Sequence, residues 1–147
     1  MMLDTAAITP NHSLWPEFKR ALEGASLPSA DLGDPQQYFF AFTSGGAPCA
    51  FGGVFLSGTD ALLRSVVAMP DSRGLGSGAR VVAMLARWAK AQGVKRLWLL
   101  TTDADGFFEL QGFSRMDRLA APPAIAATRE FSALCPSSAV LMCLTLV

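Results

Sequence analysis

The feature that most constrains this chain of 147 residues is a glycine-rich turn at residues 69–78, which joins an apolar segment to an amphipathic one. Residues 61–69 are dense in apolar side chains and end at Pro70, as expected of a central strand. Residues 78–92 then place apolar side chains at helical spacing. Glycines let a main chain approach a ligand closely, so N–H groups at the positive end of a helix can converge on phosphate oxygens. Because Arg73 adds a permanent cation, the turn predicts a pyrophosphate-binding loop.

The rest of the chain alternates between strand-like and helix-like segments. Ser13 is the predicted N-cap of a helix that ends at Gly24. Gly52 and Gly53 predict a bulge inside a strand. Further strands are predicted at residues 37–43, 49–56, 61–69, 96–102, 113–119 and 139–146, and further helices at residues 78–92 and 104–111. The pattern predicts one α/β domain over residues 1–147.

Composition limits the classes of protein that this chain can be. Hydrophobic residues make up 51% of the sequence and charged residues 16%, which favours an extensive core or an oligomer interface over disorder. The formal net charge is zero, so no overall field attracts nucleic acid or an anionic membrane. The apolar run at residues 140–144 suggests a buried strand or the edge strand of a homodimer.

The cysteines and the start of the chain bear on the compartment. Cys49, Cys135 and Cys143 are odd in number and lack metal-binding spacing, so neither a disulfide framework nor a metal site is expected. The sequence shows no basic region followed by an apolar stretch at its start, and no run approaches the roughly 20 apolar residues of a membrane helix. We therefore expect a cytoplasmic protein.

Two motifs resemble the Gcn5-related N-acetyltransferases, the GNAT family. The spacing Arg73-x-x-Gly76-x-Gly78 is similar to the acetyl-CoA signature of that family. Residues 101–113 are similar to the strand, short helix and Gly-Phe segment that follow in the same family. Together the two motifs span roughly a third of the chain and occur in the right order.

The resemblance implies a fold and a cofactor. The fold would be a mixed, mostly antiparallel sheet of six to seven strands flanked by helices, with a V-shaped splay between strands 61–69 and 96–102. The pantetheine arm of acetyl-CoA would enter the splay, and its diphosphate would sit on the glycine-rich loop. The residues implied in cofactor binding are Val66, Val67, Ala68, Arg73, Gly74, Leu75, Gly76, Ser77, Gly78, Thr101, Ala104, Phe107 and Phe108.

Catalytic groups are harder to assign than cofactor contacts. In the resembling family transfer is usually direct, so Cys135 need not be a nucleophile. Asp103 and Glu130 are candidate general bases, although either carboxylate can also be read as solvated surface. Phe108 stands where a Tyr commonly donates a proton to the CoA thiolate, and a phenyl ring cannot do so. Thr101 replaces a frequent Asn and keeps only part of its hydrogen-bonding capacity.

The segment after Phe113 resembles acetyltransferases found in bacterial arsenic-resistance gene clusters. That resemblance implies a small toxic amine, such as an anionic amino-acid analogue, which Arg64 would bind bidentately unless Arg64 is a surface charge. Two other functions stay open. One is acetylation of a peptide or protein amine, and the other is an acyl-CoA-binding module without catalysis.

A dinucleotide-binding alternative has to be weighed against the acetyltransferase interpretation. Gly74-x-Gly76-x-x-Ala79 satisfies a permissive form of the Rossmann fingerprint. That fingerprint requires the glycines directly after the strand and an acid about 20 residues after it. Here residues 70–73 intervene, and the first acid beyond the glycines is Asp103, which disfavours the dinucleotide reading.

Overall fold

A seven-stranded sheet with the strand order β1-β2-β3-β4-β5-β7-β6 organises the chain. The computed structural model describes residues 3–72 and 76–147. The strands are β1 (Asp4–Ile8), β2 (Gln37–Ser44), β3 (Ala47–Ser57), β4 (Asp60–Ala68), β5 (Arg96–Thr101), β6 (Ser114–Met116) and β7 (Val140–Thr145). The α-helices are α1 (Trp15–Gly24), α2 (Ser77–Ala91), α3 (Asp105–Leu110) and α4 (Pro123–Ala126), with 3-10 turns at Pro70–Ser72 and Arg118–Ala120 and a π-helical turn at Glu130–Leu134.

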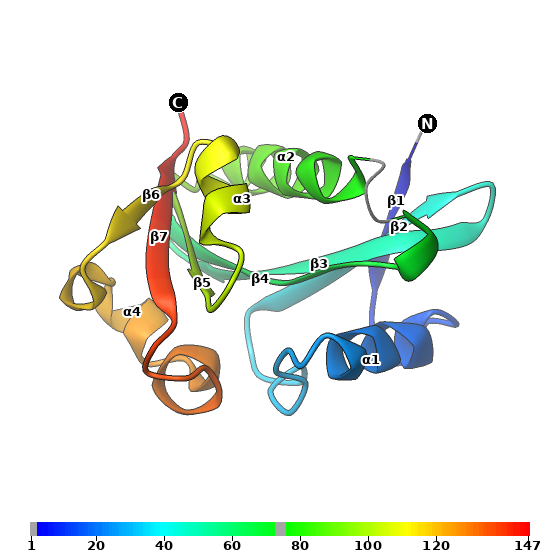
Figure 1. Cartoon of the computed structure of the whole chain (residues 1–147), viewed down its shortest axis with the longest axis horizontal. Coiled ribbons are helices and arrows are strands. Elements are labelled where there is room, and N and C mark those ends of the chain that lie inside the picture. Colours follow the sequence, from blue (N-terminus) through cyan, green and yellow to red (C-terminus); the bar gives the residue numbers. More distant parts are fainter. Residues whose placement is uncertain (1–2, 73–75) are drawn as a thin grey trace.

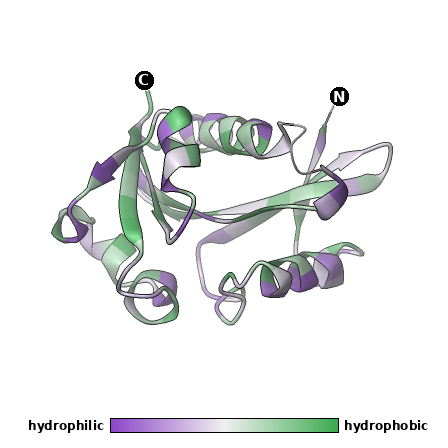
Figure 2. Ribbon diagram, viewed as in Figure 1, coloured by the Kyte–Doolittle hydropathy of each residue, from purple (hydrophilic) through white to green (hydrophobic). Residues whose placement is uncertain are grey.

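Helices cover both faces of this sheet (Figure 1). α2 and α3 lie on one face, whereas α1 and the C-terminal segment with α4 lie on the other. Figure 2 shows strong apolar colouring along β7 and α2, whereas β6 at the edge of the sheet is hydrophilic. The amphipathic spacing of α1 and α2 determines which side of each helix is buried.

Three apolar clusters form where helices meet the sheet. On the α2 face, Val81 and Leu85 pack with Phe42 and other strand residues. On the α1 face, Phe18 packs against Phe39 and Phe51, with ring centroids 5.2 and 5.3 Å apart. The third cluster lies under α4, whose Ile125 is fully buried among strand side chains.

The strand pairing confirms the predicted fold class, including the splay. β4 and β5 are parallel and pair only at Asp60↔Arg96, Ala61↔Leu97 and Leu62↔Trp98, while all other pairs in the sheet are antiparallel. Beyond Leu62 and Trp98, β4 and β5 share no backbone pairing. A doubly wound parallel sheet, which the dinucleotide alternative requires, is therefore not the fold of this chain.

A bulge between β3 and β4 lies where Gly52 and Gly53 predict one. Gly53 pairs with Arg64 and Phe51 with Val67, so Ser65 and Val66 together face Gly52. Ser65 is the extra residue of the bulge and has a left-handed backbone conformation, with φ of 58°. The bulge shifts the alternation of β4, so Leu63 and Val66, three positions apart, both contact the α2-side cluster, whereas Val67 contacts the α1-side cluster.

Several sequence predictions need correction. The N-cap of α1 is Leu14 and not Ser13, and the Leu14 N–H donates to His12 Nδ1 at 3.1 Å. The predicted strand at residues 113–119 is only the three-residue β6. Of the two alternatives predicted for the apolar run at 140–144, the buried strand is right and the edge strand is wrong, because β7 lies between β5 and β6. The prediction of a homodimer through this strand therefore has no exposed edge of β7 to support it.

Candidate active site

A cavity of about 820 Å³ opens where β4 and β5 diverge. Leu63, Arg64 and Val66 line it from β4, and Leu99 and Thr101 from β5. The loop at residues 25–30 and the segment at residues 134–136 line it on the α1 side, whereas Gly78, Phe107 and Phe108 line it on the α2 side. The cavity therefore passes from one face of the sheet to the other through the splay.

The α2 side of the cavity has the features of an anion-binding helix start. Gly76 precedes α2 in the left-handed conformation with φ of 79°, which glycine adopts without strain. The first N–H groups of the 15-residue helix have no partner within the helix. The buried Ser77 Oγ has no hydrogen-bond partner in the described part of the chain. These donors fit a phosphate group, while Arg73, Gly74 and Leu75 lie outside the described residues.

Aromatic rings close the cavity beside the start of α2. The Phe107 ring lies so near Gly78 that a Cβ there would be 3.3 Å from Phe107 Cζ. Phe108 is buried and packs edge-to-face on Phe113 at 5.7 Å between centroids. Both phenylalanines thus serve as packing residues and as walls of the cavity. Thr101 Oγ1 accepts a hydrogen bond from the Ala104 N–H at 3.0 Å and so fixes the start of α3.

The predicted cofactor residues on β4 divide between two environments. Val66 and Ala68 line the cavity, whereas the Val67 side chain is buried in the α1-side cluster. The contact predicted for Val66, Val67 and Ala68 uses the main chain. Among the described residues, β5 pairs with β4 only as far as Leu62, so the splay-facing main chain from Leu63 to Val67 is geometrically open to an added strand-like ligand.

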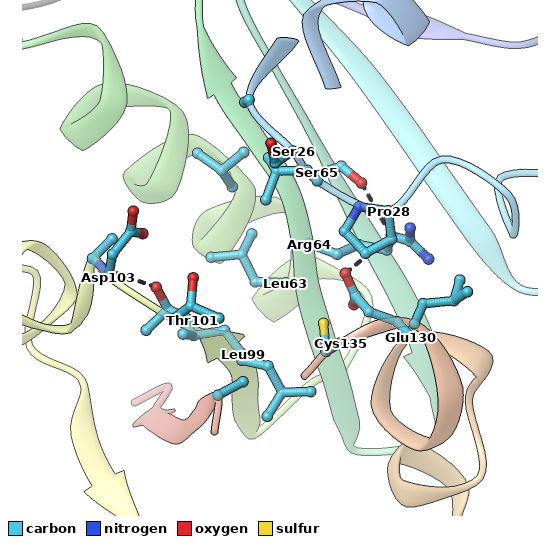
Figure 3. Close-up of a pocket in the computed structure, with 18 of the residues that line it drawn as sticks. Ser26, Pro28, Leu63, Arg64, Ser65, Leu99, Thr101, Asp103, Glu130 and Cys135 are labelled. Atoms are coloured by element: carbon cyan, nitrogen blue, oxygen red, sulfur yellow. Dashed lines mark hydrogen bonds and ion pairs between the residues drawn. The ribbon is translucent and has the colours of Figure 1, made fainter. Parts of the chain in front are cut away.

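On the opposite wall, Arg64 is buried with carboxylates. Its Nη2 donates to Asp31 Oδ1 at 2.7 Å and its Nη1 to Asp31 Oδ2. Its Nε donates to Ser65 Oγ at 3.1 Å and lies 3.9 Å from Glu130 Oε1. Arg64 is 3% exposed, so the reading of Arg64 as a surface charge is wrong. Figure 3 shows Arg64, Glu130 and Cys135 across the cavity from Thr101 and Asp103.

The two candidate bases differ in environment. Asp103 lines the cavity but is exposed to solvent. Glu130 also lines the cavity and is only 6% exposed, so the reading of Glu130 as solvated surface is wrong. Burial raises the pKa of Glu130 to about 7, with Arg64 opposing the rise and Asp31 adding to it. A carboxyl with that pKa changes its protonation state near neutral pH.

Cys135 lines the same cavity next to Glu130. Burial, followed by the negative charge of Glu130, raises the pKa of the Cys135 thiol to about 12. A thiol with such a pKa is a poor nucleophile at neutral pH. Cys49 and Cys143 are free and buried away from the cavity lining.

Sequence reasoning missed several residues of this site. Asp31 lies in a loop outside both motifs, yet it is fully buried and holds Arg64. The loop at residues 25–30 and the segment at residues 134–136 form the α1-side walls without any motif. Arg118 fixes that second segment, because its guanidinium donates to the carbonyls of Ala139 and Phe131 at 3.0 and 3.2 Å. The sequence offered one signal for Asp31, namely the position of Arg64 inside an apolar strand. An arginine buried in such a strand requires a carboxylate from elsewhere in the chain.

Comparison with known families agrees with this architecture. The model of the acetyltransferase (GNAT) family matches residues 7–113 of the sequence. The chain belongs to the GNAT family. A search of curated proteins finds no sequence match.

Solved structures share the GNAT fold at low sequence identity. N-acetylglutamate synthase from Neisseria gonorrhoeae, in complex with coenzyme A and N-acetyl-glutamate, superposes with a TM-score of 0.78 at 15% identity. The match covers 98% of this chain and 35% of the synthase, so this chain spans about a third of that protein's length. An acyl-CoA N-acyltransferase described as putative, from Klebsiella pneumoniae, gives 0.78 at 19% identity and covers 99% of both chains.

A third similar structure is that of a Mycobacterium tuberculosis protein in complex with CoA. Its TM-score is 0.77 at 18% identity, and the match covers 97% of this chain and 99% of that one. At these identities the likeness concerns the fold. In the described part of this chain, no helix combines the length and hydropathy that crossing a bilayer requires.

Proposed function

We propose that this chain transfers an acetyl group from acetyl-CoA directly to the amine of a small molecule. The observation that carries the proposal is the cavity where β4 and β5 diverge, which begins at the start of α2 and ends beside a buried carboxyl, Glu130. The first end offers donors for a diphosphate. The second offers an acceptor for a proton.

The cofactor would lie along the splay. Main-chain groups of Val66, Val67 and Ala68 would pair with the pantetheine amides as an added strand does. Gly76, Ser77 and Gly78, together with the predicted contacts at Arg73, Gly74 and Leu75, would hold the diphosphate. Thr101, Ala104, Phe107 and Phe108 would exclude water from the pantetheine arm. Bound acetyl-CoA supplies an electrophilic thioester carbonyl and a thiolate leaving group.

The residues at the other end would prepare the amine. An acceptor amine arrives mainly as an ammonium at neutral pH, so a base must take one proton before attack. Glu130 is the better placed of the two candidates because it is buried and its pKa lies near 7. Asp103 is the alternative base on the opposite wall. Phe108 has no proton to donate to the CoA thiolate, so we assign protonation of the thiolate to no side chain of this protein.

The shape of the cavity favours a small acceptor over a protein. Residues 25–30 and 134–136 line the acceptor end and would limit the size of an acceptor that binds between them. The resemblance to arsenic-resistance acetyltransferases adds an anionic amino-acid analogue as one specific candidate. Arg64 would be its receptor, and the acceptor's anionic group would have to displace or share the carboxylate of Asp31, which now occupies the terminal amino groups of Arg64.

Calorimetric titration with acetyl-CoA, CoA and NADH tests the first half of the proposal. We expect binding of both CoA compounds and no signal from NADH, whereas binding of NADH alone would reject an acetyltransferase. Gly76→Ala should weaken acetyl-CoA binding about tenfold, equivalent to about 1.4 kcal/mol, because the start of α2 is disturbed. Gly58→Ala is the matched control, since Gly58 also has a positive φ, of 62°, but lies in the β3–β4 turn.

Release of CoA thiol across a panel of amines tests the second half. The panel should pair amino-acid analogues with amines of similar size that lack an acidic group, and should include a peptide amine. Turnover with a small amine supports the proposal. Turnover only with the peptide favours protein acetylation, and CoA binding without any turnover favours a non-catalytic acyl-CoA-binding module.

A further inference from the structure

Arg64 and Glu130 line the cavity on its α1 side, and the buried Asp31 lies beside Arg64. The guanidinium hydrogen-bonds to Asp31 and not to Glu130. We propose that Asp31 and Ser65 are positioning residues that hold Arg64 away from Glu130, so that the Glu130 carboxyl stays free to accept the proton of the acceptor amine. This inference rests on the proposed function of Glu130 as a general base. It adds two residues that do not themselves touch the reacting atoms.

The hydrogen bonds of Arg64 carry the argument. Both terminal nitrogens donate to the two oxygens of Asp31, and neither side chain of that pair is exposed. The Nε–H, which is the donor nearest to Glu130, donates instead to Ser65 Oγ at 3.1 Å. The nearest atoms of Arg64 and Glu130 are 3.9 Å apart, and the Glu130 carboxylate accepts no hydrogen bond from any residue that the structure describes.

The backbone of β4 places Ser65 for this role. Ser65 is the bulge residue, and its left-handed backbone allows Arg64 and Ser65 to bond as chain neighbours. In a regular strand, side chains of adjacent residues point to opposite faces of the sheet and do not meet. The bulge at Gly52 therefore serves both the cavity wall and the orientation of Arg64.

Glu130 faces charged or titratable groups from each neighbouring element. Arg64 approaches it from β4, Asp31 from the loop before β2, and Cys135 from its own segment. Asp103 lies across the cavity, beyond contact (Figure 3). Arg129, the preceding residue, is turned away and binds Asp34 through two nitrogens at 2.8 Å.

The consequence for Glu130 follows from these neighbours. Asp31 compensates most of the charge of Arg64, so burial dominates and the Glu130 pKa lies near 7. If Arg64 instead donated to Glu130, the carboxylate would be stabilised and its pKa would fall. A base that holds its ion pair permanently would have little tendency to take a proton from an amine.

Carbon-13 NMR titration of the glutamate side chains measures the pKa of Glu130 directly. The Glu130→Gln variant identifies which signal belongs to Glu130. We expect the Glu130 pKa of Asp31→Asn to fall by about one to two units, because Arg64 is released toward Glu130. The acidic limb of kcat/KM against pH should move down by the same amount. Asp34→Asn is the matched control, because it removes a carboxylate from the same loop but one that pairs with Arg129 and not with Arg64. It should leave the Glu130 pKa and the acidic limb of kcat/KM unchanged.

Ser65→Gly provides a second variant should Asp31→Asn not fold. It removes the hydroxyl that engages Nε and suits the left-handed backbone at this position. The Glu130 pKa should again fall, by less than in Asp31→Asn. An unchanged Glu130 pKa in either folded variant overturns the inference.

The two proposals fail differently. The NMR titration needs no turnover, so a shifted Glu130 pKa in a protein that does not bind acetyl-CoA would reject the proposed function while keeping the charge arrangement. Acetyl transfer with an unchanged Glu130 pKa in the variants would keep the function and reject the positioning role of Asp31 and Ser65.

Discussion

The terminal amino groups of Arg64 donate to the carboxylate oxygens of Asp31, 33 positions away in the chain, and neither side chain is exposed to solvent. This pair joins β4 to the loop that follows α1, and its Arg64 member lines the cavity. Because the pair is buried, losing either partner leaves a charge without compensation. The acceptor end of the cavity thus depends on a contact between distant parts of the sequence.

Asp31→Ala should lower the free energy of unfolding by about 3 to 5 kcal/mol, since it leaves the Arg64 charge buried and uncompensated. Urea denaturation at pH 7 measures the loss. Asp34→Ala is the control, because the Arg129–Asp34 pair is solvent-exposed and its removal should change stability little. Equal small losses in both variants would show that Arg64 finds another partner.

Glu130→Gln should reduce kcat/KM by about 100-fold to 10,000-fold, the range that a positioned general base contributes. The acidic limb of the pH profile, centred near the Glu130 pKa of about 7, should disappear with it. Asp103→Asn should keep that limb, since Asp103 is exposed on the opposite wall. If the limb persists in Glu130→Gln and is lost in Asp103→Asn, the roles of the two carboxylates are reversed.

The raised pKa of Glu130 also makes stability depend on pH. Between pH 4.5 and about 7 the folded protein binds this proton and the unfolded chain does not, so the contribution is complete below 4.5 and is lost as pH rises through 7. The shift corresponds to at most about 3 kcal/mol. The difference in unfolding free energy between the native chain and Glu130→Gln, measured by urea from pH 5 to 8.5, should fall with increasing pH. A flat difference would mean that Glu130 titrates normally.

Local sequence patterns predicted the parts of the fold that local chemistry determines. The apolar run of β4, the glycine-rich turn and the spacing of α2 were all visible in the sequence, and so was the bulge at Gly52. β1 was not predicted, because four of its five residues are exposed and it shows no apolar alternation. It is a strand because β2 offers an edge to pair with.

The acceptor end of the cavity could not be predicted in the same way. Glu130 appeared as one of two equivalent carboxylates, and only packing of the C-terminal segment on the sheet distinguishes it from Asp103. Asp31 looked like an ordinary loop residue, because its role depends on a partner in β4. Burial and long-range charge pairing are properties of the folded chain, so single residues show them only weakly in a sequence.

Cys135 should resist alkylation, because burial raises its pKa to about 12 and leaves almost no thiolate at neutral pH. Iodoacetamide at pH 7.5, followed by mass spectrometry, should modify Cys135 at least about tenfold more slowly than the same peptide in urea. Cys135→Ser should retain acetyl transfer, as direct attack by the amine requires. Rapid modification together with an inactive Cys135→Ser variant would instead indicate an acetyl-cysteine intermediate.

Gly52 is a position at which one added methyl group should affect both the fold and the cofactor site. A Cβ at Gly52 would lie 2.6 Å from Leu85 Cδ1 and 3.2 Å from Val81 Cγ1, both on buried side chains of α2. Gly52→Ala should therefore cost about 1 to 3 kcal/mol in urea denaturation, because α2 must move off the sheet. Acetyl-CoA binding should weaken as well, since the start of α2 moves with it. Gly24→Ala is the control, because a Cβ built at Gly24 would meet nothing within 4 Å beyond its chain neighbours and the backbone of its own helix. Helix α1 should tolerate alanine there without loss of stability or binding.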